Sequence, residues 1–182
     1  MAINKDSYNT YVEFPELSYN CISYLVDSSD AEILWRLLKY NDNDAWRLDT
    51  NHPNLTKVEK GALIYSGEAN DDEFRVFSDI GADTAVTKEM TTLRVSPLTL
   101  NPSNYVLGRI MMSFEIYSHF HINTLSNKKT RIDMIVQNIL KNLNGQEVDG
   151  IGRLAFNKRC RMTTIGKVPY KGRHLTMTNW LG

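Results

Sequence analysis

From Tyr105 to Phe120 the chain alternates between two kinds of side chain with the two-residue period of a β-strand. Six even positions of this run share one face and are apolar: Val106, Ile110, Met112, Phe114, Ile116 and Phe120. The odd face is mixed, because Leu107, Met111 and Tyr117 share it with polar residues, so we expect something to cover part of it. A neighbouring subunit could provide this cover. Gly108 is expected to mark a bulge that lets so long a strand bend.

A different period follows this strand and predicts a half-buried helix, because apolar residues recur three and four positions apart. These positions are Ile132, Ile135, Val136, Ile139, Leu140 and Leu143. Ser126 or Asn127 is expected to cap the start of the helix. Asn144-Gly145 is expected to close it, since both residue types tolerate the left-handed backbone that ends helices.

Two capping boxes predict two further helices in the first half of the chain. The first box, Ser29 to Glu32, opens a helix whose apolar face holds Ile33, Leu34, Leu37 and Leu38. The second box, Thr56 to Glu59, opens a short helix that reaches about Tyr65.

Shorter strands are expected elsewhere. Leu93 and Val95 begin one, which Pro97 and Pro102 limit to an edge or to a short piece followed by a loop. The C-terminal part is expected to form a hairpin of two strands, 153–164 and 174–181, joined by a loop at 166–172.

The element order predicts an α+β fold, with an antiparallel or mixed β-sheet flanked by helices. We expect a single domain over residues 22–182, preceded by an N-terminal arm of residues 1–21. Residues 74–80 and 84–87 give no firm assignment.

The composition is that of an ordinary globular domain, with 42% hydrophobic and 23% charged residues. The first residues lack the basic and apolar regions of a secretory signal, and no uninterrupted apolar stretch is long enough to cross a membrane. We therefore expect no membrane partner. Cys21 and Cys160 lie far apart without a partner motif, so we expect reduced, buried thiols and a reducing compartment during folding.

The formal net charge of zero conceals two oppositely charged halves. Residues 1–90 carry seventeen acidic and eight basic residues, whereas residues 91–182 carry four acidic and thirteen basic residues. Complementary halves of this kind favour a head-to-tail contact between copies, which closes into a ring or extends into a filament. The alternative is that the halves neutralise each other within one monomer.

The stretch GRLAFNKRCRMTTIGKVPYKGR, residues 152–173, contains seven cations and no carboxylate. Arg153, Arg159 and Arg161 are expected on one strand face, with Lys158 breaking the pattern. The other cations are expected in and after the hairpin loop: Lys167, Lys171 and Arg173. These residues could line a channel for a phosphate backbone, dock on the acidic surface of a neighbouring subunit, or form a solvated face. We rank the solvated face lowest, because uncompensated cations repel one another.

The sequence offers little that indicates catalysis. It has no phosphate-binding glycine loop, GxSxG elbow, CxxC pair or HExxH motif, so we expect no enzyme and no cofactor. His119 and His121 would point to the same face of a strand, but no carboxylate or cysteine nearby in the sequence completes a metal site. A polar strand end or a pH-sensitive contact is the preferred interpretation, and no metal is expected. Asp71, Asp72 and Glu73 are interpreted as a solvated loop and as candidates for an acidic interface rather than as magnesium ligands.

Several phrases, taken in order, resemble the neck and tail-terminator proteins of tailed bacteriophages. These phrases are ILWRLLKYNDNDAW, NLTKVEKGALIYSG, LRVSPLTLNPSNYVLGRIMMSFEIYSHFHINTL and KKTRIDMIVQNILKNLNG, followed by the closing hairpin. The similarity covers residues 22–182 and depends on element order rather than on a catalytic signature.

The resemblance implies a small α+β subunit that assembles into a ring, usually hexameric, on the end of the tail tube. Such a ring ends tube polymerisation and joins the tail to the head connector within the virion, after assembly in the host cytoplasm. The implied partners are other copies of the chain, the tail tube protein, the head connector and neck proteins, and DNA passing without sequence specificity. Contact with a sheath protein stays open. The alternatives are a head-completion or adaptor protein in an adjacent ring and a standalone DNA-binding protein that uses the basic hairpin.

Overall fold

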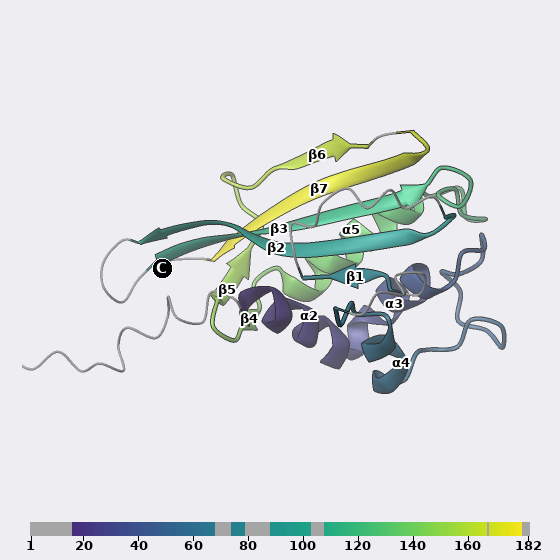
Figure 1. Ribbon diagram of the computed structural model, residues 1–182, viewed down its shortest axis with the longest axis horizontal. Helices are drawn as coiled ribbons and strands as arrows, with labels where there is room; N and C mark the ends of the chain where they lie inside the picture. The colour runs from purple at the N-terminus through teal and green to yellow at the C-terminus, as the bar shows by residue number, and fades with distance from the viewer. Residues whose placement is uncertain (1–15, 68–73, 79–87, 103–107, 167, 180–182) are drawn as a thin grey trace, which may run out of the picture.

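The computed structural model describes residues 16–67, 74–78, 88–102, 108–166 and 168–179. The helical elements are α2 (Leu17–Asp27), the 3-10 turn η3 (Ser29–Ala31), α3 (Glu32–Lys39), α4 (Lys57–Ala62) and α5 (Arg131–Leu143). The strands are β1 (Val76–Phe77), β2 (Thr91–Pro102), β3 (Gly108–His119), β4 (Glu147–Val148), β5 (Gly152–Ala155), β6 (Met162–Ile165) and β7 (Tyr170–Asn179). Figure 1 shows how these elements are arranged.

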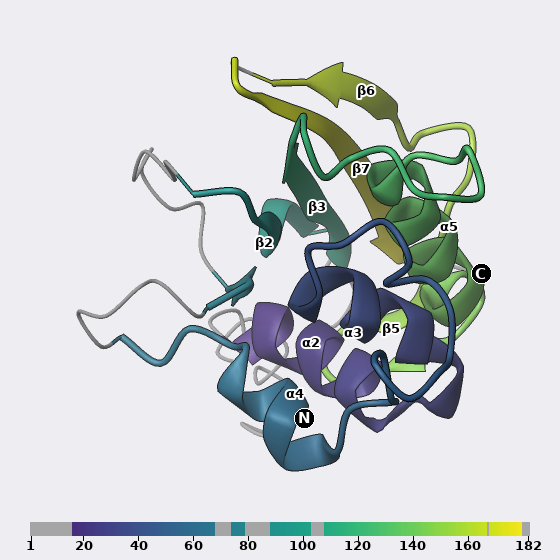
Figure 2. The ribbon, with the colours of Figure 1, turned by 90° about the vertical axis from the view of Figure 1, so that its right-hand side faces the viewer.

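The strands form one mixed sheet in the order β1-β2-β3-β7-β5-β4, and β6 also pairs with β7. The three long strands, β2, β3 and β7, are antiparallel, whereas β1 pairs in parallel with β2. Figure 2 shows that the sheet is curled and that α2, α3 and α5 lie on one side of it. The expectation of an α+β fold with a mixed sheet flanked by helices is therefore confirmed.

The core lies between the sheet and these helices. The even residues of β3 supply its sheet side, with Ile110, Met112, Phe114 and Ile116 all at most 2% exposed. On the helix side, α5 buries five of its six predicted apolar residues: Ile132, Ile135, Val136, Ile139 and Leu143. The alternating and helical periods therefore predicted the core of this region correctly. Phe120, beyond the end of β3, is an exception and is 46% exposed.

The odd face of β3 is only partly covered within the chain. Ser113 and His119 are buried, whereas Met111 and Tyr117 are half-buried. Gly108 begins β3 opposite Pro102, and the irregularity in pairing lies instead on β2, between Pro97 and Thr99. The expected bulge at Gly108 is therefore not what bends these strands.

The prolines of β2 do not reduce it to a short piece, but they lie where the strand is an edge, which is the other alternative that the sequence offered. Pro97 and Pro102 lie within a twelve-residue strand that pairs with β3 along its length. The physical reason is that β1 reaches only Leu93 and Arg94, so among the described residues the second half of β2 has a partner on one side alone. Prolines are tolerated on such an edge because a nitrogen that faces away from the neighbouring strand is not needed as a donor.

The N-terminal boundary of the packed domain differs from the prediction. Helix α2 begins at Leu17, and both Leu17 and Cys21 are fully buried in the core, so the last residues of the expected arm belong to the domain. The rest of the arm, residues 1–15, lies outside the described residues. Cys21 and Cys160 are both free thiols, and burial raises the pKa of Cys21 to about 12.

The predicted helix start is right in one region and shifted in two others. Thr56 and Glu59 form the expected capping box of α4, although this helix ends at Ala62. Ser28, one residue before the predicted cap, accepts the hydrogen bond that starts η3. Thr130, rather than Ser126 or Asn127, caps α5 by accepting from the backbone N–H of Asp133.

The buried guanidinium of Arg131, at the start of α5, fixes that helix to α3. Its Nε donates to the carbonyl of Ile122 (3.0 Å), one terminal nitrogen donates to those of Leu37 (2.7 Å) and Tyr40 (2.5 Å), and the other donates to that of Asp42 (2.6 Å). Two of these carbonyls lie at the C-terminal end of α3, where a helix favours cations. Burial lowers the pKa of Arg131 to about 10, so the hydrogen bonds must offset a desolvation cost.

A second buried polar side chain, that of His52, holds the loop that follows α3. His52 is 7% exposed and lies between two carboxylates, with Nε2 at 2.8 Å from Asp42 and Nδ1 at 2.9 Å from Asp49. Burial of the ring disfavours its charged form, but the two carboxylates outweigh this effect and raise the pKa of His52. Arg131 and His52 thus hold the loop around Asp42 through its backbone and its side chain.

Candidate functional site

The basic stretch does not form the continuous strand that its alternation predicted. Arg153 lies on β5, whereas Lys158, Arg159 and Arg161 lie in the connection between β5 and β6. The expectation that Arg153, Arg159 and Arg161 share one strand face is therefore wrong. The basic residues also continue onto β7, which begins at Tyr170 and so shortens the expected loop of 166–172.

Local hydrogen bonds explain the interruption. The side-chain oxygen of Asn157 accepts from the backbone N–H of Arg159 at 2.9 Å, and its carbonyl accepts from the N–H of Cys160. Asn favours turns of this kind because its side chain can replace a backbone partner. The chain meets β7 again where Arg161 exchanges hydrogen bonds with Thr176, and β6 then starts at Met162.

Two of the predicted cations are engaged within the chain. Arg173, on β7, pairs with Asp133 at 3.2 Å and donates to Thr164 at 2.5 Å, while Arg153 donates to the carbonyl of Gly145 at 2.9 Å. Lys167 and the acidic candidates Asp71, Asp72 and Glu73 lie outside the described residues.

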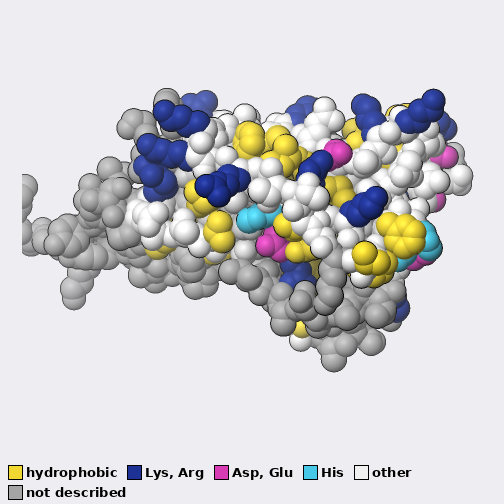
Figure 3. Space-filling model, turned by 90° about the horizontal axis from the view of Figure 1, so that it is seen from above, with side chains coloured by type: hydrophobic (Ala, Val, Ile, Leu, Met, Phe, Trp, Pro, Cys, Tyr) yellow, Lys and Arg dark blue, Asp and Glu magenta, His cyan; other side chains and the backbone are white. Residues whose placement is uncertain are grey.

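The remaining predicted cations, which we call the basic edge, are Lys158, Arg159, Arg161 and Lys171. All four are exposed, and no carboxylate of the described residues forms an ion pair with them. Figure 3 views the molecule from above, toward β6 and β7, and shows many Lys and Arg side chains with few acidic ones. Within the described part of the chain, this surface is not neutralised locally.

The two charged halves hardly neutralise each other within the described residues. Most ion pairs of Lys and Arg join groups from the same half, as Lys39–Glu59 and Lys60–Glu32 do. Lys141–Asp30, at 3.3 Å, is the one such pair in the described residues that joins a cation after residue 90 to an acid before it. Both of its side chains are more than 60% exposed, so this pair stabilises the fold little.

Strand β6 adds an open sheet edge beside the basic edge. Among the described residues it pairs only with β7, in register from Met162 opposite Leu175 to Ile165 opposite Gly172. Its side chains are mainly exposed, including Met162 at 48%. An edge strand presents unpaired backbone groups, which makes it a template for pairing with another chain.

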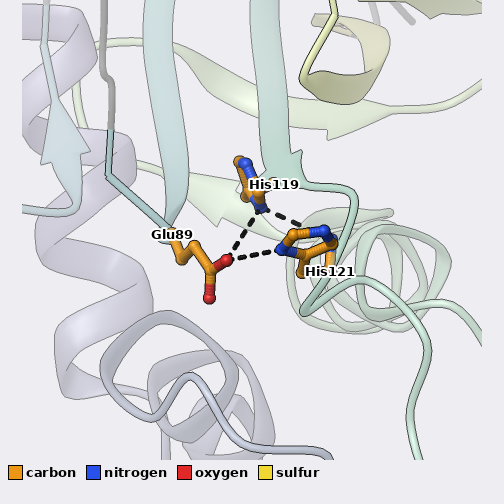
Figure 4. A group of neighbouring side chains, drawn as sticks. All are labelled: Glu89, His119 and His121. Carbon is orange, nitrogen blue, oxygen red and sulfur yellow. Dashed lines mark hydrogen bonds and ion pairs between the residues drawn. The ribbon is translucent and has the colours of Figure 1, made fainter.

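A cluster of possible metal ligands lies at the C-terminal end of β3, and Figure 4 shows its three side chains. The Nδ1 atom of His121 lies 2.5 Å from the Oε1 atom of Glu89, and the Nδ1 atom of His119 lies 3.8 Å from the same oxygen. One donor atom from each residue lies within 4.8 Å of the other two. The hydrogen bond from His121 is the main cause that lowers the pKa of Glu89 and keeps it ionised.

The expectation that no carboxylate lies near the histidines is therefore wrong in space, although it holds in the sequence. Because β2 and β3 are antiparallel, the residues just before β2 lie beside those just after β3, and the backbone N–H of His119 donates to the carbonyl of Met90. This pairing brings Glu89 to the histidines. A predicted β2–β3 register would have revealed the cluster.

The sequence matches the YomW family over residues 31–179, which is most of the chain. The chain therefore belongs to the YomW family. This family consists of phage-derived gene products of the SPbeta type, which makes the chain a phage protein. No curated protein and no solved structure matches it. In the residues that the structure describes, no helix is long and apolar enough to cross a membrane.

Proposed function

We propose that this phage protein is a structural subunit that forms a ring at the head-tail junction, where it ends the tail tube and joins it to the head connector. The observation that carries the proposal is the basic edge, whose four cations have no described carboxylate partner in their own chain. Charges that are left uncompensated in the monomer favour a partner of opposite charge. Membership of a phage family supports the same class of function.

The open edge of β6 supports a contact between copies in particular. A neighbouring subunit could extend the sheet at this edge while its acidic surface meets Arg159 and Arg161. Such a contact joins different surfaces of two copies and is heterologous, which is the geometry that builds rings. The proposal does not depend on catalysis.

The first test is the assembly state of the full chain together with its location in particles. Native mass spectrometry is expected to detect a closed oligomer, either alone or after addition of the tail tube or connector protein. Electron microscopy of virions with the chain labelled is expected to show density at the neck. Absence of the chain from purified virions would overturn the proposal.

A charge-reversal pair of variants tests whether the basic edge makes the contact. Arg159→Glu with Arg161→Glu is expected to abolish oligomer formation. Lys128→Glu with Lys129→Glu changes the net charge equally in the exposed turn before α5 and serves as the matched control. If both double variants assemble like the wild type, the basic edge does not hold the subunits together.

The second candidate function is DNA binding by the free chain, which the same unpaired cations favour. Contacts to phosphate groups would give affinity for any DNA sequence that decreases steeply with salt concentration. A gel shift at low salt distinguishes the two functions, because the DNA-binding candidate requires that Arg159→Glu with Arg161→Glu weakens binding to all sequences alike. An adaptor or head-completion protein in an adjacent ring would instead be located by the electron microscopy described above.

A further inference from the structure

We propose that Glu89, His119 and His121 form a binding site for a divalent first-row transition metal ion such as Zn²⁺. The proposal is independent of the ring and departs from our sequence-based expectation that the chain binds no metal. Two imidazoles and a carboxylate suit zinc and its neighbours, whereas calcium and magnesium prefer oxygen ligands throughout. The donor set therefore selects the class of ion.

The spacing of the donor atoms is close to what such an ion requires. Zinc–ligand bonds of about 2.0–2.2 Å in a tetrahedron place the ligand atoms roughly 3.3 Å apart. The distance from Glu89 Oε1 to His119 Nδ1 is 3.8 Å, and the distance to His121 Nδ1 is 2.5 Å. These two distances have to change by about 1 Å or less, which the exposed Glu89 and His121 side chains can supply by small rotations.

The buried ligand is held in place by the surrounding backbone. The His119 side chain is buried, with the residue 6% exposed, and the backbone N–H of His119 donates to the carbonyl of Met90. Its Nδ1 accepts a long hydrogen bond from the backbone N–H of His121 at 3.4 Å, so this nitrogen carries no proton, and an ion would take the place of that N–H at its lone pair. Tyr170 packs edge-on against the ring and donates its hydroxyl hydrogen to the carbonyl of Lys88 at 2.5 Å. Three strands therefore position the site.

The ion would join the segment before β2 to the turn after β3. Three protein ligands leave at least one coordination position of a tetrahedral ion for water or for a group from a partner. The site lies at the molecular surface, since the side chains of Glu89 and His121 are 54% and 56% exposed. Phe120, which packs against His121, is also largely exposed, so a partner that reaches the ion would meet an apolar side chain beside it.

The test is calorimetric titration of the chelator-treated full chain with ZnCl₂, accompanied by the visible absorption spectrum with Co²⁺. The wild type is expected to bind one equivalent, and Co²⁺ is expected to give the intense absorption of a four-coordinate site. Glu89→Gln and His121→Ala each remove a ligand at an exposed position and are expected to weaken binding at least tenfold. His174→Gln removes a histidine from the middle of β7, away from the cluster, and is expected to bind like the wild type.

Each outcome decides the proposal. The proposal would be overturned if the wild type bound no stoichiometric metal. It would also be overturned if Glu89→Gln and His121→Ala bound the metal as tightly as the wild type does. A loss in His174→Gln as large as in the ligand variants would also overturn it, because the ion would then lie elsewhere. Circular dichroism and the metal-free melting temperature of each variant separate loss of the site from loss of the fold. If one ligand variant misfolds, the other gives the result.

Discussion

Replacing Arg131 by Met should destabilise this protein more than any exposed substitution, because it leaves buried carbonyl groups without a donor. The guanidinium donates to four backbone carbonyls, from Ile122, Leu37, Tyr40 and Asp42, and it is fully buried. Methionine fills a similar volume but donates no hydrogen bond. The substitution therefore tests the hydrogen bonds without creating a large cavity.

The expected magnitude follows from two opposing contributions. Each buried carbonyl that loses its partner costs about 1–3 kcal/mol, which gives roughly 4–12 kcal/mol for the four. Removing the charge recovers the net cost of burying it beside Asp42, which is about 3 kcal/mol for a pKa lowered from 12.5 to about 10. Water reaching some of the carbonyls reduces the loss further, so we expect a net decrease of about 3–5 kcal/mol in the free energy of unfolding.

Urea denaturation followed by tryptophan fluorescence measures this change, because Trp35 is a residue of α3 and lies in the core. The matched control is Arg173→Met, which removes a partly exposed arginine paired with Asp133 and is expected to cost about 1 kcal/mol or less. If Arg131→Met also loses less than about 1 kcal/mol, the buried guanidinium does not hold α5 to α3 in the way described.

Three further outcomes are expected from single substitutions. The pKa of His52 is raised in the folded protein, so the stability from its charged form is complete below about pH 6.5 and is lost as the pH rises through the raised value. The free energy of unfolding should therefore decrease over that pH range in the wild type and not in His52→Gln. Thr56→Ala removes the capping box of α4 and should cost about 1 kcal/mol in thermal unfolding, whereas Thr163→Ala, at an exposed position of β6, should cost less. Gly172→Ala should destabilise by about 1–3 kcal/mol or more, because the added Cβ would lie 2.7 Å from the carbonyl of Ile116; a melting temperature equal to that of the wild type would contradict the close packing of β7 on β3.

The sequence predicted the elements whose hydrophobic period is long and uninterrupted. Helix α5 and the even face of β3 follow from local patterns, because burial on one face repeats with the geometry of the backbone. The capping box at Thr56 could also be predicted, since both of its partners lie within four residues. These features depend on contacts that are close in the sequence.

The features that the sequence did not reveal depend on distant partners. The alternation of residues 153–164 suggested one strand, but turn hydrogen bonds from Asn157 divide it into β5 and β6. The sequence does not single out Arg131, because its carbonyl partners on α3 and after it lie about ninety residues away. Glu89 could be joined to His119 and His121 only through the β2–β3 register. Local patterns carry no information about such pairs.

The oppositely charged halves of the chain could neutralise each other within one monomer or between copies. The ion pairs of the described residues help to compare these two alternatives. If the halves neutralised each other internally, strong ion pairs should cross from residues 1–90 to residues 91–182, yet the described residues contain one Lys or Arg pair of this kind, and it is exposed. Arg173 is paired, but with Asp133 of its own half, which leaves the balance between the halves unchanged. The basic edge then lies next to the open strand β6, so that backbone pairing and charge pairing are available at one surface. A contact between copies that uses both would be oriented by the strand and selected by the charge.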